Sequence, residues 1–97
     1  MAMRAHEDDQ PTDDELIARH IELPAGYHTA DRARLTDYGV SVPAIIYTLQ
    51  GEGADVNTAV EAYGVSVEAV HAAIAYYERH KEVIDARITL NVASWSD

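Results

Sequence analysis

The chain has 97 residues, which is enough for one domain with a short tail. Without cysteine it has no disulfide framework, no thiolate nucleophile and no thiolate metal site. Its 17 acidic and 7 basic residues give a formal net charge of −10, which repels phosphate backbones and anionic membranes. No apolar run approaches the ~20 residues that span a bilayer, and the acidic N-terminus is not a signal peptide, so we expect a cytoplasmic protein.

The first 14 residues have almost nothing to bury. Around Pro11 they carry five carboxylates, on Glu7, Asp8, Asp9, Asp13 and Asp14. A segment of this composition gains too little from burial to fold alone. We therefore expect an acidic flexible leader at residues 1–14, followed by a single domain at residues 15–97.

Two segments between residues 15 and 41 each fit two alternative structures. Residues 15–23 fit a short helix or a strand, and a proline and a glycine end the segment in either case. Residues 30–38 could form a helical turn. Alternatively, residues 33–35 and 39–41 could pair as the arms of a small β-hairpin, which is the structure we favour.

Three helices follow, each with a start signal. Ser41 is a good N-cap, and the apolar residues behind it recur at i, i+3, i+4 and i+7, namely Val42, Ile45, Ile46 and Leu49. Asp55 caps a second helix, which Gly64 ends. Ser66 caps a third, whose apolar residues continue at spacings of three and four to about Arg87. We predict one long third helix of about 20 residues.

Residues 55–73 match a helix-turn-helix pattern. Gly64 permits a positive φ, Val65 fills the angle between the helices, and Val60 lets them cross closely. The sequence therefore predicts a mainly α fold. It is a three-helix, winged-helix-like helix-turn-helix domain with a short N-terminal β-hairpin, a long third helix and a core at residues 35–88.

The same helix is poorly equipped to read DNA. A recognition helix uses its N-terminal side chains in the major groove. Here Ser66 and His71 could donate a hydrogen bond, whereas Glu68 repels phosphate. Arg32 and Arg34 could contribute phosphate contacts. These two arginines, Ser66 and His71 are the candidate DNA-binding residues.

We find no set of residues suited to catalysis or to a metal. His71 and His80 lie on opposite sides of one predicted helix, and His20 and His28 flank an uncertain loop. There is no nucleophile elbow, and the glycines at 51 and 53 lack the lysine and hydroxyl of a phosphate loop. We expect no enzyme activity, no metal and no cofactor.

The second half of the predicted third helix carries more apolar surface than the short elements before it could cover. Tyrosine is also enriched where interfaces gain their energy. The candidate residues for a dimer or partner contact are Tyr76, Tyr77, His80, Val83, Ile84 and Ile88. Alternatively, the N-terminal segment and residues 89–95 fold back over this stripe.

Residues 35–88 resemble the bacterial and archaeal family called domain of unknown function 433. The resemblance rests on residues 35–49, 59–66 and 70–88, and most of all on Ala-Ala-Ile-Ala-Tyr-Tyr at residues 72–77 with His80 and Ile84-Asp85 after it. At residues 36–40 the chain has Thr-Asp-Tyr-Gly-Val, where the family usually has a turn like Gly-Thr-Arg-Ile. A role for that arginine does not carry over.

The resemblance implies a helix-turn-helix or winged-helix-like fold that is often dimeric, similar to the domain of VapB-like antitoxins. Such antitoxins are proposed to neutralise PIN-domain ribonuclease toxins and to bind their own promoter. We therefore expect a homodimeric, non-enzymatic antitoxin-like protein that binds a PIN-type ribonuclease. The alternatives are a DNA-binding regulator without a toxin and an orphan dimeric interaction protein. The sequence does not name the partner, the operator or the source organism.

Overall fold

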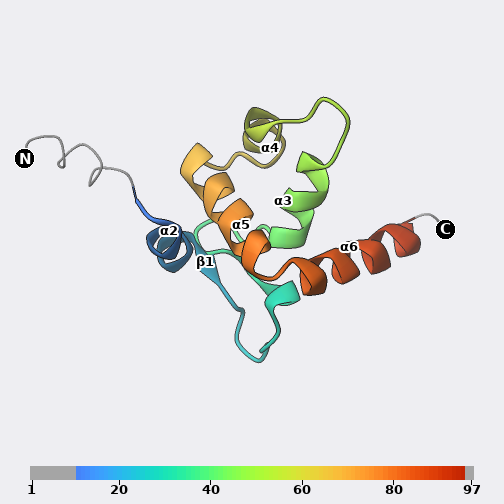
Figure 1. Ribbon diagram of the computed structural model, residues 1–97, viewed down its shortest axis with the longest axis horizontal. Coiled ribbons are helices and arrows are strands. Elements are labelled where there is room, and N and C mark those ends of the chain that lie inside the picture. Colours follow the sequence, from blue (N-terminus) through green and yellow to red (C-terminus); the bar gives the residue numbers. More distant parts are fainter. Residues whose placement is uncertain (1–10, 96–97) are drawn as a thin grey trace, which may run out of the picture.

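The computed structural model describes residues 11–95, and side chains within this range up to residue 93. The described part is mainly helical, with one small antiparallel sheet (Figure 1). In chain order its elements are α2 (Asp13–His20), β1 (Ile21–Glu22), the 3-10 helix η1 (Ala30–Arg32), β2 (Arg34–Leu35), α3 (Val42–Leu49), α4 (Val56–Tyr63), α5 (Val67–Arg79) and α6 (Lys81–Trp95).

Helices α3, α4 and α5 pack against one another, and each begins at its predicted cap. The Ser41 hydroxyl accepts a hydrogen bond from the backbone N–H of Ala44, at 3.2 Å. The Asp55 carboxylate and the Ser66 hydroxyl accept equivalent bonds three residues on, at 3.1 and 3.0 Å. These bonds satisfy backbone donors that no helical carbonyl can reach.

The turn between α4 and α5 has the predicted geometry. Gly64 adopts φ 68°, and its N–H donates to the Val60 carbonyl at 2.9 Å. Val65 is buried directly after it. The left-handed residue ends α4 and the buried valine holds the start of α5 against the core.

The small sheet differs from the predicted hairpin. β2 pairs antiparallel with β1, in the register Ile21↔Leu35. The predicted arms also meet, through a bridge between Arg34 and Ser41 and a bond from the Leu35 N–H to the Val40 carbonyl at 2.8 Å. Both strands of the sheet are two residues long, and the winged-helix part of the prediction is not confirmed.

The N-terminal segment is a helix and then a strand, so both alternatives for residues 15–23 hold in part. The predicted leader extended too far, because Asp13 and Asp14 form the first turn of α2. Thr12 caps this turn in a reciprocal capping box with Glu15, which fixes the helix start. The rest of the leader prediction, residues 1–10, lies outside the described residues.

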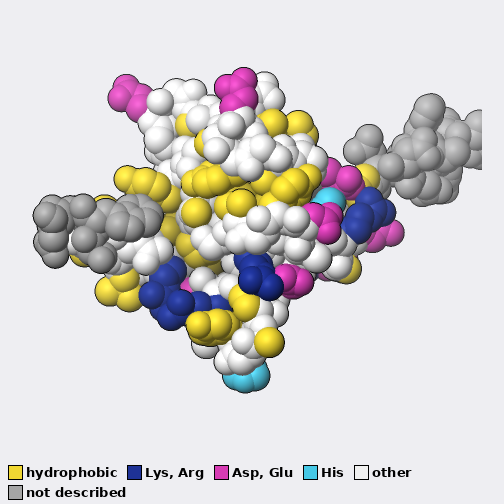
Figure 2. All heavy atoms as spheres, turned by 180° about the vertical axis from the view of Figure 1, so that it is seen from behind, with side chains coloured by type: hydrophobic (Ala, Val, Ile, Leu, Met, Phe, Trp, Pro, Cys, Tyr) yellow, Lys and Arg dark blue, Asp and Glu magenta, His cyan; other side chains and the backbone are white. Residues whose placement is uncertain are grey.

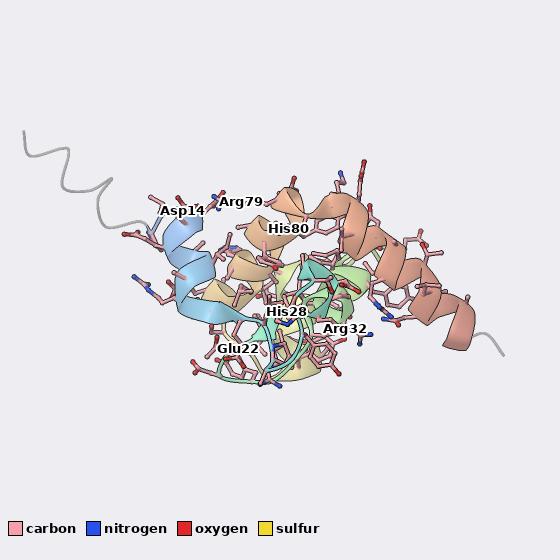
Figure 3. The ribbon with its side chains drawn as sticks, turned by 90° about the horizontal axis from the view of Figure 1, so that it is seen from below. Asp14, Glu22, His28, Arg32, Arg79 and His80 are labelled. Carbon is pink, nitrogen blue, oxygen red and sulfur yellow. The ribbon has the colours of Figure 1, made fainter. Side chains whose placement is uncertain are left out.

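Helix α2 runs antiparallel along α5. At one end Arg19 contacts Glu68, with 2.8 Å between the guanidinium nitrogen and the carboxylate oxygen. At the other end Arg79 lies beside Asp14, at 2.5 Å (Figure 3). Between these ion pairs Leu16 is buried.

The long third helix was predicted wrongly, because the structure divides it at His80 into α5 and α6. His80 leaves the helical conformation with φ −134° and ψ 37°. No proline or glycine causes this break. It turns the chain so that Ile84 and Ile88 pack into the core with α3, which a straight helix would have carried past it. Residues 89–95 continue α6 instead of folding back.

Small side chains dominate the core. Its largest fully buried members are Leu35, Val42, Pro43, Ile45, Val70 and Ile84. Five alanines are also fully buried, namely Ala33, Ala59, Ala69, Ala72 and Ala73. Since alanine lets helix backbones approach closely, a chain without phenylalanine still forms a packed interior.

We expect Gly64→Ala to lower the free energy of unfolding by about 1–2 kcal/mol, because a Cβ makes the left-handed conformation unfavourable. A Cβ built at Gly64 meets no atom within 4 Å, so the effect is on the backbone alone. Urea unfolding measures it. Gly64→Asn is the control and loses less, since asparagine tolerates this region. A fully stable Gly64→Ala variant would contradict the turn geometry.

Asp31 on η1 and Arg87 on α6 form a partly buried ion pair at 2.8 Å, with side chains 12% and 27% exposed. The pKa of Asp31 is lowered from 3.8, first by a hydrogen bond from Thr29 and, against the effect of burial, by Arg87. A carboxylate with a lowered pKa stabilises the fold above its unfolded pKa, and this contribution is lost as the pH falls through the folded value.

We therefore expect Asp31→Asn to cost roughly 1.5–3 kcal/mol at pH 7, and to remove part of the stability loss that the wild type shows below about pH 4. Urea unfolding at a series of pH values measures both effects. Asp37→Asn, at an exposed carboxylate, is the control. Parallel curves for Asp31→Asn and the wild type across this range would contradict the assignment.

Candidate functional site

The four candidate DNA-binding residues do not form one surface. Arg34 donates to the Glu22 carboxylate at 2.7 Å, and the Arg32 guanidinium lies 5.1 Å from the centre of the Tyr27 ring. His71 instead lies on α5, and Ser66 is the N-cap of that helix, where its hydroxyl accepts a bond from the Ala69 N–H. His71 is exposed.

Two of the six predicted partner-binding residues are part of the core. Ile84 is 0% exposed and Ile88 is 8% exposed, so neither side chain is available to a partner. The prediction assumed a straight helix with surplus apolar surface, and the break at His80 places this surface against α3.

Three others, Tyr76, Tyr77 and His80, serve contacts within the chain. The rings of Tyr76 and His80 lie 4.4 Å apart between centroids. The Tyr77 hydroxyl donates to the Asp85 carboxylate at 2.7 Å, which joins α5 to α6 across the break. Val83 is the member of the predicted set with a strongly exposed apolar side chain, at 45%.

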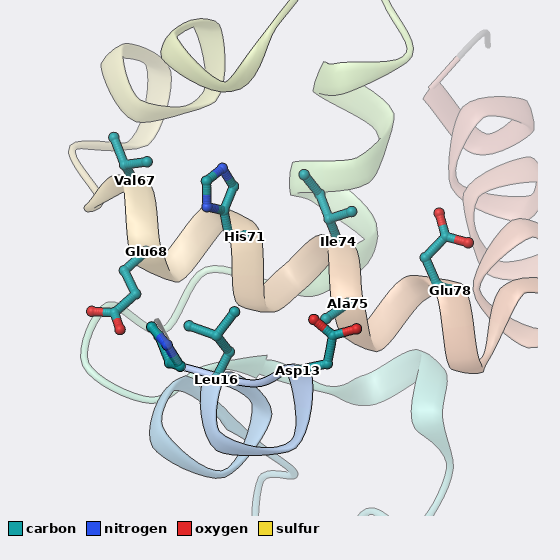
Figure 4. Close-up of a pocket in the computed structure, with 9 residues that line it drawn as sticks. Asp13, Leu16, Val67, Glu68, His71, Ile74, Ala75 and Glu78 are labelled. Carbon is teal, nitrogen blue, oxygen red and sulfur yellow. The ribbon is translucent and has the colours of Figure 1, made fainter. Parts of the chain in front are cut away.

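A surface groove of about 610 Å³ lies beside α2 and α5 (Figure 4). Four of its lining residues share one face of α5, at the spacing i, i+4, i+7 and i+11, namely Val67, His71, Ile74 and Glu78. From α2 come Asp13 and the buried Leu16. The prediction missed this groove because nothing local indicates that α2 packs along α5. The spacing on α5 was its one detectable signal.

The groove combines an apolar wall with an acidic rim. Leu16, Ile74 and Ala75 supply apolar surface, and Val67 is 46% exposed at one end. Asp13, Glu68 and Glu78 also line it, while its described lining includes no lysine or arginine. Arg19 neutralises Glu68 from outside the groove. Such a surface can bury apolar groups and attract cations.

A second hollow, of about 270 Å³, has the opposite character. Arg32, Arg34 and Arg87 all line it, together with Tyr27. Each guanidinium already has a partner in the chain, through Tyr27, Glu22 and Asp31 respectively. The cluster therefore offers less positive charge than three free arginines would.

Within residues 11–95, no group of three or more histidine, aspartate or glutamate side chains is placed to hold a metal ion. None of the described helices is both long and apolar enough to cross a membrane.

Comparison with known proteins finds no matching family model, no similar curated protein and no similar solved structure. The resemblance to domain of unknown function 433 therefore stays an expectation from the sequence.

The hydrogen bond to Asp85 is the largest of the causes that raise the pKa of Tyr77 to about 12, with burial adding to it. We expect Asp85→Asn to lower this pKa towards 10, because a neutral acceptor no longer disfavours the tyrosinate. A titration followed by tyrosinate absorbance measures the change. Tyr77 ionises in a step near pH 12, after tyrosines of ordinary pKa, and Tyr77→Phe identifies this late step by removing it. The hydrogen bond between Tyr77 and Asp85 stabilises the fold fully below about pH 10, and this contribution is lost as the pH rises through about 12. A late step that Asp85→Asn leaves unchanged would contradict the contact.

Proposed function

We propose that this protein is a non-enzymatic, antitoxin-like helix-turn-helix module that binds a basic protein, a PIN-type ribonuclease, through the groove beside α5. The observation that carries this proposal is the composition of the groove. It joins an apolar wall to the carboxylates of Asp13 and Glu78 and to that of Glu68, which Arg19 partly neutralises.

The chemistry of the partner follows from this composition. A ribonuclease that binds an RNA backbone needs a cationic cleft, because phosphates are held by lysine and arginine. Carboxylates on an inhibitor can occupy such a cleft in place of phosphates and speed the encounter. The apolar wall supplies the buried contact that charge alone does not give, and Val67 and Ile74 are its accessible members.

The same features disfavour DNA as the ligand of this face. The first turns of the second helix are the part that enters the major groove in a helix-turn-helix protein. In this chain that region carries the acidic Glu68, which already pairs with Arg19 of α2, and residues 67–73 include no lysine or arginine. A regulator that binds promoter DNA is therefore the less supported alternative.

The test is isothermal titration of the full chain against a PIN-type ribonuclease encoded by a neighbouring gene, with ribonuclease activity as a second readout. We expect binding and inhibition by the wild type. Glu78→Lys should weaken binding about tenfold or more, since it reverses a charge on the rim of the groove. Glu61→Lys, an exposed charge reversal on α4, is the matched control and should keep most of the affinity.

Two results would overturn the proposal. One is no binding of the wild type to such a nuclease. The other is an equal loss in Glu78→Lys and Glu61→Lys, which would indicate attraction by net charge alone. A gel shift with the chain's own upstream DNA at low salt is the third arm, and a specific complex there would support the DNA-binding alternative.

A further inference from the structure

Helix α6 is apolar on two faces, and one of them has no cover within the described chain. Ile84 and Ile88 point into the core. The exposed face carries four residues at successive spacings of three, four and three, namely Val83, Ala86, Leu90 and Ala93. This is the spacing by which one helix packs along another. Leu90 is 59% exposed.

The exposed face lines one side of a groove of about 520 Å³, whose other side is formed by η1. Figure 1 shows α6 extending away from the other helices, and all four residues of this face are exposed. In Figure 2, which views the molecule from behind, hydrophobic side chains reach the surface around its C-terminal end. The groove therefore offers apolar side chains over about two turns of α6, from Val83 to Leu90, against which a second helix can pack.

Charge distinguishes this face from the rest of the chain. Helix α6 carries two cations, Lys81 and Arg87, and two carboxylates, Glu82 and Asp85, so its own net charge is zero. The whole chain carries −10. Arg87 is held by Asp31 at 2.8 Å, so its charge is neutralised locally. Two copies of α6 thus add no local charge repulsion to the general repulsion between two acidic chains.

The sizes of the four exposed side chains indicate how two copies fit. We propose that α6 packs antiparallel against α6 of a second copy of this chain. In that arrangement Leu90 lies opposite Ala86 of the other copy and Val83 lies opposite Ala93. Every layer then pairs a large side chain with an alanine, which fills the space evenly. A parallel pair would instead set leucine on leucine and alanine on alanine.

The antiparallel arrangement also closes with two-fold symmetry, because the same face serves both copies. Its axis passes near Ile88, midway between the paired layers. Lys81 at the start of one helix then lies near the C-terminal end of the other, where a cation is favourable. The proposal does not rest on the nuclease partner, since the α5 groove shares no lining residue with this face.

The first test is the oligomeric state of the full chain by sedimentation equilibrium. We expect a dimer for the wild type and at least a tenfold weaker dimer for Leu90→Glu. Leu23→Glu is the matched control, since Leu23 is also exposed, at 42%, and lies outside α6. Circular dichroism and urea unfolding verify that both variants fold. A monomeric wild type, or equal weakening by both substitutions, would overturn the proposal.

The second test uses the absence of cysteine, because any disulfide must then come from an introduced residue. Chains with Ala86→Cys and chains with Leu90→Cys are oxidised separately and as a mixture. We expect a covalent dimer in the mixture, which joins position 86 of one chain to position 90 of the other. Each variant alone should give little covalent dimer, because two copies of position 86, or two copies of position 90, lie too far apart for a disulfide. Covalent dimers of each variant alone, with none between the two, would show a parallel pair and overturn the proposed arrangement.

Discussion

The burial of Ile84 and Ile88 determines the course of the last third of the chain. Both side chains reach the core only because the helix that begins at Ser66 breaks at His80 and restarts in a new direction. Tyr77 and Asp85 then hold the two helices together across the break. One packing requirement therefore sets the direction of α6, the position of η1 beside it and the identity of the face that remains open.

The sequence predicts well those features that depend on neighbouring residues. Ser41, Asp55 and Ser66 begin their helices as expected, and Gly64 ends α4 in the left-handed conformation. These signals are local because each cap bonds a backbone group three residues away. The apolar stripe of α3 was likewise predictable from the spacing of its residues alone.

The prediction failed where the local structure depends on contacts between distant parts of the chain. The apolar spacing continues through His80, and the residues around it include no helix breaker, so no local signal marks the break. Without it, Ile84 and Ile88 were interpreted as surplus surface. The groove on α5 was missed for a related reason, since it needs α2 beside α5, and the ion pairs that join them lie 49 and 65 residues apart in sequence. Of the predicted partner face, Val83 alone belongs to the exposed face of α6 described above.

Helix α2 is attached more weakly than α5, so it should unfold locally more often. This helix has one buried residue, Leu16, and is fastened at its ends by two ion pairs whose arginines are about half exposed. Exposed ion pairs contribute little and weaken as salt rises. Helix α5, by contrast, buries five residues in the interior. Amide hydrogens of α2 should therefore exchange with solvent through local unfolding in which α5 stays folded. Higher ionic strength should increase the rate of this exchange.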